Sequence, residues 1–274
     1  MKYSVAAQSV TGRVRRQNED NLFLDGEILD LVHKDSALLS RELTDDIPRL
    51  VGIFDGMGGH DSGEVASYIA AATTRECAGI QSPCDSKEAF LNAICMEAND
   101  AVCEKAEGSQ MGTTCAMVYF HKGTYTVCNV GDSPVFLFRN GAMRQISVDH
   151  NQRATYEKIT GQKAPAGQKF KLTQCIGIPA DEMLIEPHIA SGNVRNGDIF
   201  LICSDGLTDM VVPEDIAEIL RVCKVPEQAV EELITRAMEA GGRDNITIVY
   251  AAAEGTSNRV RTLDGFLKQF FDKK

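Results

Sequence analysis

Residues 50–79 read LVGIFDGMGGHDSGEVASYIAAATTRECAG and contain the strand, turn and helix around which the fold can be predicted. The first five are apolar and predict a buried strand that ends at Asp55. Asp55-Gly56 is a common turn pair, and the glycine-rich stretch after it predicts a loop. From residue 62 to 79, apolar side chains recur at helical spacing. A carboxylate therefore stands where a buried strand ends, shortly before a helix.

Outward from this stretch, strands are predicted at 2–10, 21–24, in three or four segments within 112–147, and at 182–189, 198–203 and 246–252. Helices are predicted at 86–106, 213–223 and 226–240. Residues 26–49 are of mixed character and predict a loop with a short helix. This order lacks the regular β-α-β-α alternation of a parallel sheet. It predicts an α+β fold in which antiparallel sheets carry helices on their outer faces.

Composition excludes several classes of protein. Of 274 residues, 43% are hydrophobic and 24% charged, which is typical of a globular chain with a sizeable core. The net charge of −11 disfavours nucleic acid as a partner. No apolar run is long enough to span a membrane, and the first residues lack the apolar region of a signal peptide. The nine cysteines form no C-x-x-C pair, which favours buried thiols in a reducing, cytoplasmic compartment.

Five acidic sites share one position relative to the predicted strands. They stand at a strand end or in the adjoining turn, and they are Glu19-Asp20, Asp55, Asp132, Asp205 and Asp244. Carboxylates gathered at one sheet edge repel each other and resist ionisation, unless a divalent cation lies between them. Mg²⁺ and Mn²⁺ prefer such oxygen ligands, and a pair of these ions can activate water for attack on phosphorus. Taken singly, each Asp could equally be a turn former or a helix cap, so the residues alone leave both interpretations open.

Seven segments, in order, resemble the motifs of the PPM (type 2C) metal-dependent protein phosphatases, in particular bacterial ones. They are Gly12-Arg13-Val14-Arg15-Arg16-Gln17-Asn18-Glu19-Asp20, Asp55-Gly56-Met57-Gly58-Gly59-His60 with Gly63-Glu64-Val65-Ala66-Ser67, Gly112-Thr113-Thr114, Gly131-Asp132-Ser133, Leu172-Thr173-Gln174 to Gly177, Ser204-Asp205-Gly206-Leu207 and Asp244-Asn245-Ile246-Thr247. The resemblance covers residues 3–252. It implies two antiparallel sheets packed as a central sandwich between helices, an α-β-β-α four-layer architecture.

The resemblance also implies a metal centre. The ligands of two Mn²⁺ or Mg²⁺ ions would be Asp20, Asp55, the backbone carbonyl of Gly56, Asp205 and Asp244, with Asp55 bridging the ions. Asp132 would bind a third, weaker ion together with Asp205. Glu19 would orient water from behind the ligands, and Arg15 would bind the substrate phosphate with its guanidinium fork. Arg13 and Arg16 lie nearby, but their spacing from Glu19 fits the motif less well.

The implied activity is hydrolysis of phosphoserine and phosphothreonine on proteins by a metal-bridging hydroxide, without a phosphoenzyme. The implied partners are phosphoproteins, products of a Ser/Thr kinase. Two alternatives stay open: a pseudophosphatase that binds without turnover, and a phosphatase of a small phosphorylated metabolite.

Four features depart from the family pattern or extend beyond it. Met57 stands where some members have a histidine thought to act as general acid, and His60 is interpreted as a loop anchor. Pro134 replaces the usual arginine of the third-site turn. Within a catalytic domain at 1–255, residues 149–172 are interpreted as a short mobile flap, and residues 256–274 as a C-terminal amphipathic helix.

Overall fold

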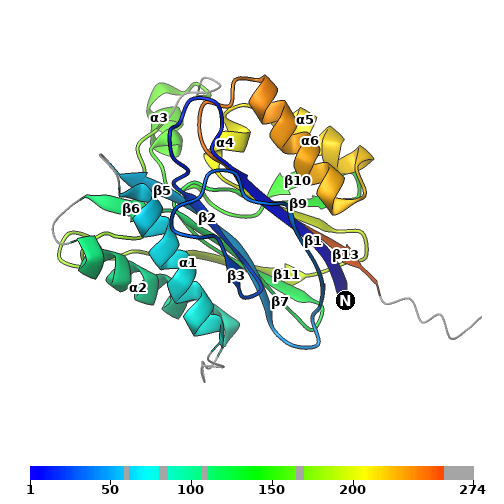
Figure 1. The fold of residues 1–274 in the computed structure, drawn as a ribbon, viewed down its shortest axis with the longest axis horizontal. Helices are drawn as coiled ribbons and strands as arrows, with labels where there is room; N and C mark the ends of the chain where they lie inside the picture. Colours follow the sequence, from blue (N-terminus) through cyan, green and yellow to red (C-terminus); the bar gives the residue numbers. More distant parts are fainter. Residues whose placement is uncertain (59–61, 80–85, 107–109, 165–169, 256–274) are drawn as a thin grey trace, which may run out of the picture.

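The computed structural model describes residues 1–58, 62–79, 86–106, 110–164 and 170–255. Their strands form two antiparallel sheets that pack face to face, with helices on the outer faces (Figure 1). The α+β four-layer architecture expected from the sequence is therefore confirmed.

The first sheet is built around the long pairing of the two ends of the described chain. Lys2 lies opposite Glu254, and the register continues to Val10 opposite Ile246. The strand order is β10 (Ala142–Gln145), β9 (Val135–Arg139), β12 (Ile199–Cys203), β13 (Ile246–Glu254), β1 (Lys2–Val10) and β4 (Leu39–Thr44). Because β12 and β13 are central, the segments that adjoin them are held firmly.

The second sheet has β5 near its centre, paired with β2 on one side and β7 on the other. Its strand order is β11 (His188–Asn193), β8 (Thr124–Val130), β7 (Cys115–His121), β5 (Arg49–Gly58), β2 (Asp20–Leu24) and β3 (Glu27–Ile28), and the short β6 (Met111–Thr113) also pairs with β5. Both β2 and most of β5 are buried, as the apolar run at 50–54 predicts.

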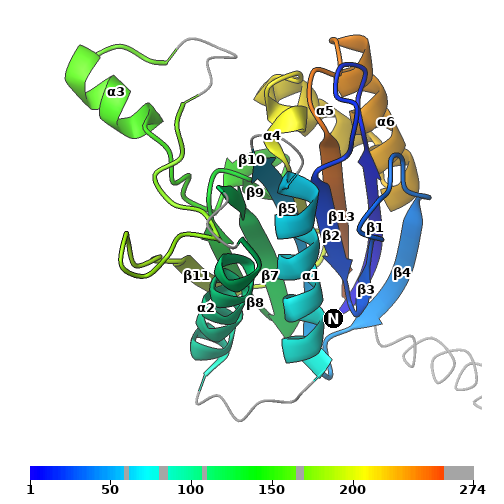
Figure 2. The same cartoon turned by 60° about the vertical axis from the view of Figure 1, so that its left-hand side comes forward.

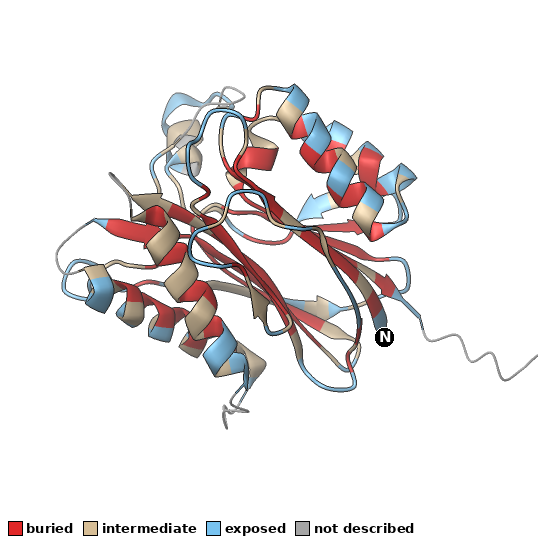
Figure 3. Ribbon diagram, in the orientation of Figure 1, coloured by how far each residue is buried: buried red, intermediate tan, exposed pale blue. Residues whose placement is uncertain are grey.

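Three hydrophobic clusters hold the four layers together, and their buried residues are among those coloured red in Figure 3. One lies between the sheets, where the ring of Phe200 packs edge-on against Phe120 and Tyr125 at centroid distances of 5.0 Å. A second joins the first sheet to α5 (Pro213–Val222) and α6 (Pro226–Glu239). The third joins the second sheet to α1 (Gly63–Gly79) and α2 (Lys87–Ala106). The remaining helices are α3 (Arg153–Thr160) and the single turn α4 (Asp205–Thr208).

The prediction of a loop with a short helix over 26–49 is wrong. This segment forms β3 and β4, and β4 is an edge strand that pairs with β1. Only Leu43 of β4 is buried, so its alternating pattern is too weak to recognise in the sequence. After β4, the buried carboxylate of Asp45 accepts a hydrogen bond of 2.6 Å from the Met1 amino group, which fixes the chain terminus.

Two strand boundaries also differ from expectation. β5 does not end at Asp55 but continues to Gly58, because β6 pairs with residues 56–58. The strand predicted at 182–189 instead begins at His188, directly after Pro187. Proline has no N–H to donate to a sheet, which explains why the ladder starts there.

The described part of 149–172 contains the helix α3, which lies away from the sandwich (Figure 2). It ends at Gly161, whose φ of +66° suits a left-handed cap. The ring of Tyr156 contacts that of Phe170 at a centroid distance of 5.4 Å. The expected loop anchor His60 and the expected C-terminal helix 256–274 lie outside the described residues. Among the helices that the structure describes, none is both long and apolar enough to cross a bilayer.

Candidate metal centre

Asp20 and Asp55 lie side by side where β2 and β5 meet. They are direct Cα partners across the two antiparallel strands, so their side chains leave the same face of the sheet. Asp55 is held from the other side by Thr114, whose hydroxyl accepts a hydrogen bond of 3.0 Å from the Asp55 N–H. Thr114 N–H in turn donates to the Asp55 carbonyl at 2.9 Å. The predicted convergence of these two carboxylates is therefore observed, with Asp20 at the start of β2 and Asp55 inside β5.

The first sheet contributes to the same place. The hydroxyls of Ser204 and Thr247 donate hydrogen bonds of 2.9 and 2.6 Å to one carboxylate oxygen of Asp20. Ser204 directly precedes Asp205 at the end of β12, and Thr247 lies near Asp244 at the start of β13. Asp20 is only 2% exposed, so these bonds join the two sheets at a point shielded from water.

The carboxylates perturb each other's ionisation. Burial, together with the charges of Asp205 and Asp244, raises the pKa of Asp20 to about 7, although the hydrogen bonds that it accepts work in the opposite direction. Burial raises the pKa of Asp55 well above its ordinary value, and the charges of Asp20, Asp205, Asp244 and Asp132 raise it further. Crowded negative charge of this kind is what a bound cation relieves.

Asp132 lies in the turn after β8, at the edge of this cluster. Burial and the nearby charge of Asp205 raise its pKa to about 6, while the Asn151 side-chain amide donates to it at 3.2 Å. The two side chains line a small cavity of about 80 Å³ together with Asp149 and Asp209. Sequence reasoning missed these last two carboxylates, because neither belongs to a strand end or to a motif.

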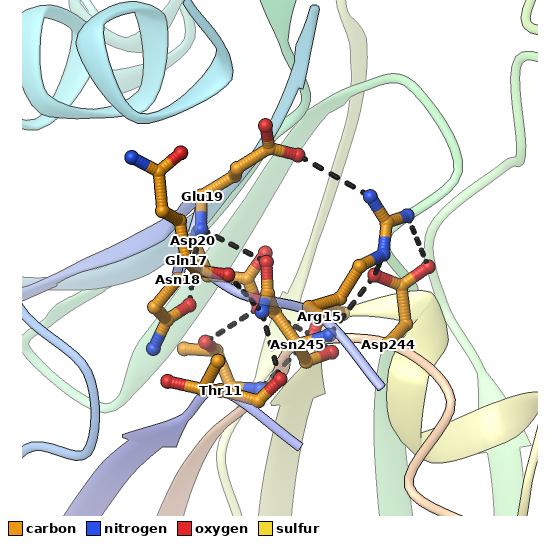
Figure 4. Close-up of polar contacts among 10 residues, drawn as sticks. Thr11, Arg15, Gln17, Asn18, Glu19, Asp20, Asp244 and Asn245 are labelled. Carbon is orange, nitrogen blue, oxygen red and sulfur yellow. Dashed lines mark hydrogen bonds and ion pairs between the residues drawn. The ribbon is translucent and has the colours of Figure 1, made fainter. Parts of the chain in front are cut away.

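Arg15 lies against the cluster on the side of Asp244 (Figure 4). Its Nε and Nη2 atoms each lie 2.8 Å from a carboxylate oxygen of Asp244, and Nη1 lies 3.5 Å from Glu19. Although burial works against the charged form, these carboxylates raise the pKa of Arg15 overall. Arg13 and Arg16 are exposed and make no ion pair within the described part of the chain. Of the three arginines, the structure thus brings Arg15 to the carboxylates.

Asn245 organises the loop that carries Arg15, a role that the sequence did not reveal. Its side-chain amide donates hydrogen bonds of 2.9 Å to the carbonyls of Thr11 and Gln17, and its side-chain oxygen accepts one of 2.8 Å from the Glu19 N–H (Figure 4). One buried amide therefore ties both ends of the loop to β13. Its position in the Asp244-Asn245-Ile246-Thr247 segment was the available signal.

Gly56 is fixed by close backbone packing. A Cβ atom there would lie 2.2 Å from the carbonyl oxygens of both Glu19 and Gly63, closer than any side chain tolerates. The N–H of Gly56 donates to the Glu19 carbonyl at 3.1 Å. The start of α1 and the loop before β2 therefore meet at this glycine, beside Asp55.

Within the described residues, no three His, Cys, Asp or Glu side chains are already arranged as the ligands of a metal ion. Arg15 contacts both carboxylate oxygens of Asp244, and the hydroxyls of Ser204 and Thr247 donate to one oxygen of Asp20. The donor set nevertheless suits hard divalent cations, because it consists of carboxylates close enough to raise each other's pKa. The chemistry of the residues therefore fits Mn²⁺ or Mg²⁺.

Comparison with known proteins supplies the family. A family model described as Protein phosphatase 2C matches residues 30–241, which is most of the chain. The chain belongs to this family. The resemblance drawn from the seven motifs is thereby confirmed, although the matched range includes neither the Arg15 loop nor Asp244.

Several bacterial proteins are similar to this chain over most of its length. The Serine/threonine protein phosphatase PstP of Mycobacterium tuberculosis is 32% identical over 253 residues, which are 90% of this chain but only 44% of PstP. The Serine/threonine phosphatase stp of Listeria monocytogenes is 29% identical and is covered to 91%. Protein phosphatase PhpP of Streptococcus pneumoniae is 30% identical over 210 residues, 73% of this chain and 83% of PhpP. This chain thus spans less than half of PstP but nearly all of the Listeria protein.

Solved structures of the family agree with the fold. The catalytic domain of PstP in complex with two manganese ions superposes with a TM-score of 0.73 at 29% identity, covering 93% of this chain and all of that domain. The Streptococcus agalactiae serine/threonine phosphatase superposes with a TM-score of 0.74 at 25% identity, covering 92% of this chain and all of that one.

The two departures from the family pattern that fall on described residues keep the architecture intact. Met57 continues β5 and pairs with Gly112 of β6. Pro134 closes the turn after Asp132, and its carbonyl accepts a hydrogen bond of 3.2 Å from the N–H of Cys203 in β12. The turn therefore stays attached to the first sheet without the usual arginine.

Proposed function

We propose that this chain hydrolyses phosphoserine and phosphothreonine esters on proteins. The observation that carries the proposal is a forked guanidinium, Arg15, beside a cluster of buried and half-buried carboxylates, of which Asp20, Asp55 and Asp132 have raised pKa values. Two relatives support it: the Listeria protein, which is named a serine/threonine phosphatase and is covered to 91% of its length, and PhpP, which is named a protein phosphatase and is covered to 83%. A pseudophosphatase or a metabolite phosphatase is not favoured by those relatives.

The carboxylates at the junction of the sheets would hold the cations. The proposed ligands of two Mn²⁺ or Mg²⁺ ions are Asp20, Asp55, the Gly56 carbonyl, Asp205 and Asp244, and Asp132 with Asp205 would hold a third. When bound, such ions activate water for attack on phosphorus and neutralise charge on the phosphoryl oxygens. The two manganese ions in the PstP structure support this assignment.

Arg15 would bind the phosphoryl oxygens with the same two nitrogens that it now places on Asp244. The carboxylate of Asp244 is a planar oxyanion and a phosphoryl group is a tetrahedral one, and the rigid guanidinium fork can bind two oxygens of either. The Arg15 side chain is 45% exposed, so an incoming phosphate can approach it. Glu19, 3.5 Å from the third nitrogen, would keep the fork oriented and accept a hydrogen bond from water near phosphorus.

The leaving serine or threonine oxygen must gain a proton. Met57 has none to give, so we propose that water supplies it. Four of the cysteines take no part in this chemistry, because Cys95, Cys115, Cys128 and Cys203 are fully buried in the core.

The place of action is proposed from the thiols. All the described cysteines are free, which is typical of a reducing compartment. We therefore propose that the phosphatase acts in the cytoplasm on phosphoproteins made by a Ser/Thr kinase.

The test is phosphate release from a phosphothreonine peptide with Mn²⁺, with EDTA, and with the variant Asp205→Ala. We expect turnover that requires Mn²⁺ and is lost in the variant. Asp215→Ala is the matched control, because Asp215 also lies in the first turn of a helix but is exposed and away from the cluster. Absence of turnover by folded, metal-loaded protein would refute the proposal.

A further inference from the structure

A cavity of about 520 Å³ begins one residue beyond Gly56. Met57 and Gly112, which are Cα partners across β5 and β6, line it, and the neighbouring pair is Gly56 opposite Thr113. Successive residues of a strand are about 3.3 Å apart, so a bound phosphopeptide would reach the cavity within about two or three residues. The cavity therefore adjoins the proposed catalytic centre without being part of it.

The wall opposite β5 is a loop held rigidly in place. Ile176 exchanges two backbone hydrogen bonds with Thr113, of 3.0 and 2.9 Å. The buried side chain of Asn99 in α2 accepts hydrogen bonds from the N–H groups of Gly177 and Ile178, at 2.8 and 3.0 Å, and donates to the Ile178 carbonyl. Because strand and helix both fix this loop, the cavity exists before any ligand binds, which lowers the entropic cost of binding.

The lining of the cavity mixes apolar side chains with polar backbone and side-chain groups, and it carries one acidic residue. Its side chains include Met57, Met111, Cys103, Ile178 and Pro179, and the single charged residue among the described lining residues is Glu182. A turn places Glu182 at the rim, with its N–H bonded to the Pro179 carbonyl at 2.9 Å.

Two observations extend this picture of the rim. The pKa of the Cys103 thiol is raised mainly by burial and further by the charges of Asp100 and Glu182, so both carboxylates lie near this half-buried lining residue. Met183 and Leu184, which follow Glu182 in the chain, are 36% and 66% exposed, so apolar side chains also reach solvent in this segment. The rim at Glu182 thus carries negative charge.

We propose that this cavity binds the side chain of a lysine or arginine a few residues from the phosphoresidue of the substrate. Such a side chain has an apolar stem for the methionine-lined wall and a cation for Glu182. An acidic side chain would be repelled there, and a purely aliphatic one would leave the carboxylate without a partner. The inference rests on the proposed phosphatase function and adds a substrate class to it.

The first experiment varies the peptide. Phosphothreonine peptides would carry Lys, norleucine or Ala at each of the three positions on either side, and kcat/KM would be measured with Mn²⁺. At one position we expect norleucine to exceed Ala by about threefold or more, because its stem is buried. Lys should exceed norleucine there by a further factor of about 3 to 5, the size of one exposed ion pair, and 0.5 M NaCl should reduce that factor.

The second experiment varies the protein. Glu182→Gln should make Lys and norleucine equivalent while preserving the advantage of both over Ala. Asp181→Asn is the matched control, because Asp181 is the exposed neighbouring carboxylate but does not line the cavity. It should keep the preference for Lys. Hydrolysis of para-nitrophenyl phosphate, which has no flanking residue, should be the same in all three proteins.

The results separate this inference from the function on which it rests. Equal kcat/KM for Lys and Ala peptides at all six positions would overturn the inference while the phosphatase stands. An equal loss of the Lys preference in Asp181→Asn would also overturn it, since the acidic surface as a whole would then be responsible. If no peptide is hydrolysed at all, the proposed function fails, and the inference fails with it.

Discussion

Replacing Arg15 with lysine should lower catalysis without unfolding the protein. Arg15 offers two nitrogens at 2.8 Å to one oxyanion, and lysine retains the charge but offers a single point contact. A hydrogen bond to a charged group contributes about 1.5–3 kcal/mol, and about 1.4 kcal/mol is tenfold in rate. Because the side chain is 45% exposed, solvent screening favours the lower part of that range. We therefore expect kcat/KM to fall about 10- to 30-fold, an estimate that combines these terms.

The assay measures phosphate release from a phosphothreonine peptide at saturating Mn²⁺, together with urea unfolding of each variant. An exposed ion pair stabilises a fold by about 1 kcal/mol at most, so the free energy of unfolding should change little. Arg13→Lys and Arg16→Lys are matched controls, because both residues are exposed in the same loop. A loss below about threefold in Arg15→Lys, or an equal loss in either control, would refute the reasoning that the fork binds phosphate.

Three further outcomes can be measured by thermal unfolding. Mn²⁺ should raise the melting temperature of the wild type, because at a concentration of 100 times Kd it stabilises the fold by about 2.7 kcal/mol. Asp55→Asn should raise the melting temperature of the metal-free protein and reduce the response to Mn²⁺. The pKa of Asp20 in the folded protein, about 7, lies above its unfolded value, so Asp20 contributes stability that is complete at low pH and is lost as pH rises toward 7. Metal-free protein prepared with a chelator should therefore melt at a lower temperature at pH 8 than at pH 5. An unchanged or higher melting temperature at pH 8 would contradict this. Gly56→Ala places a Cβ 2.2 Å from two carbonyl oxygens and should cost about 1–3 kcal/mol or more, whereas Gly79→Ala, with open space around it, should cost little.

Much of the architecture could be predicted because its signals are local. The helices at 63–79 and 87–106 show apolar faces, β12 is a continuous apolar run, and β5 contains one at residues 50–54. Asp20 and Asp55 could each be named as site residues from the motifs. Their contact, however, depends on the register of β2 against β5, and register is set by packing across the whole sheet.

What could not be predicted is the part that depends on distant contacts. β4 is recognisable only through its pairing with β1, because one face of an edge strand is solvated and its sequence is mixed. Asn99 and Asn245 hold two loops through side-chain hydrogen bonds to residues 78 to 234 positions away. No periodicity in the sequence marks such residues, because an asparagine in a buried hydrogen-bond network cannot be told by its residue type from one in a surface turn.

The carboxylate cluster gives a stronger argument for a cation than its spacing in the sequence does. Asp20 accepts two hydrogen bonds from the first sheet, and asparagine could accept them equally well without adding charge to a buried site. The charge itself works against the fold, because burial and neighbouring carboxylates raise the pKa of Asp20, Asp55 and Asp132 alike. A structural role would therefore be served as well or better by neutral side chains. Negative charge at these positions is useful when something positive binds there, and a divalent cation among oxygen ligands is the group that the geometry and the family relationship both support.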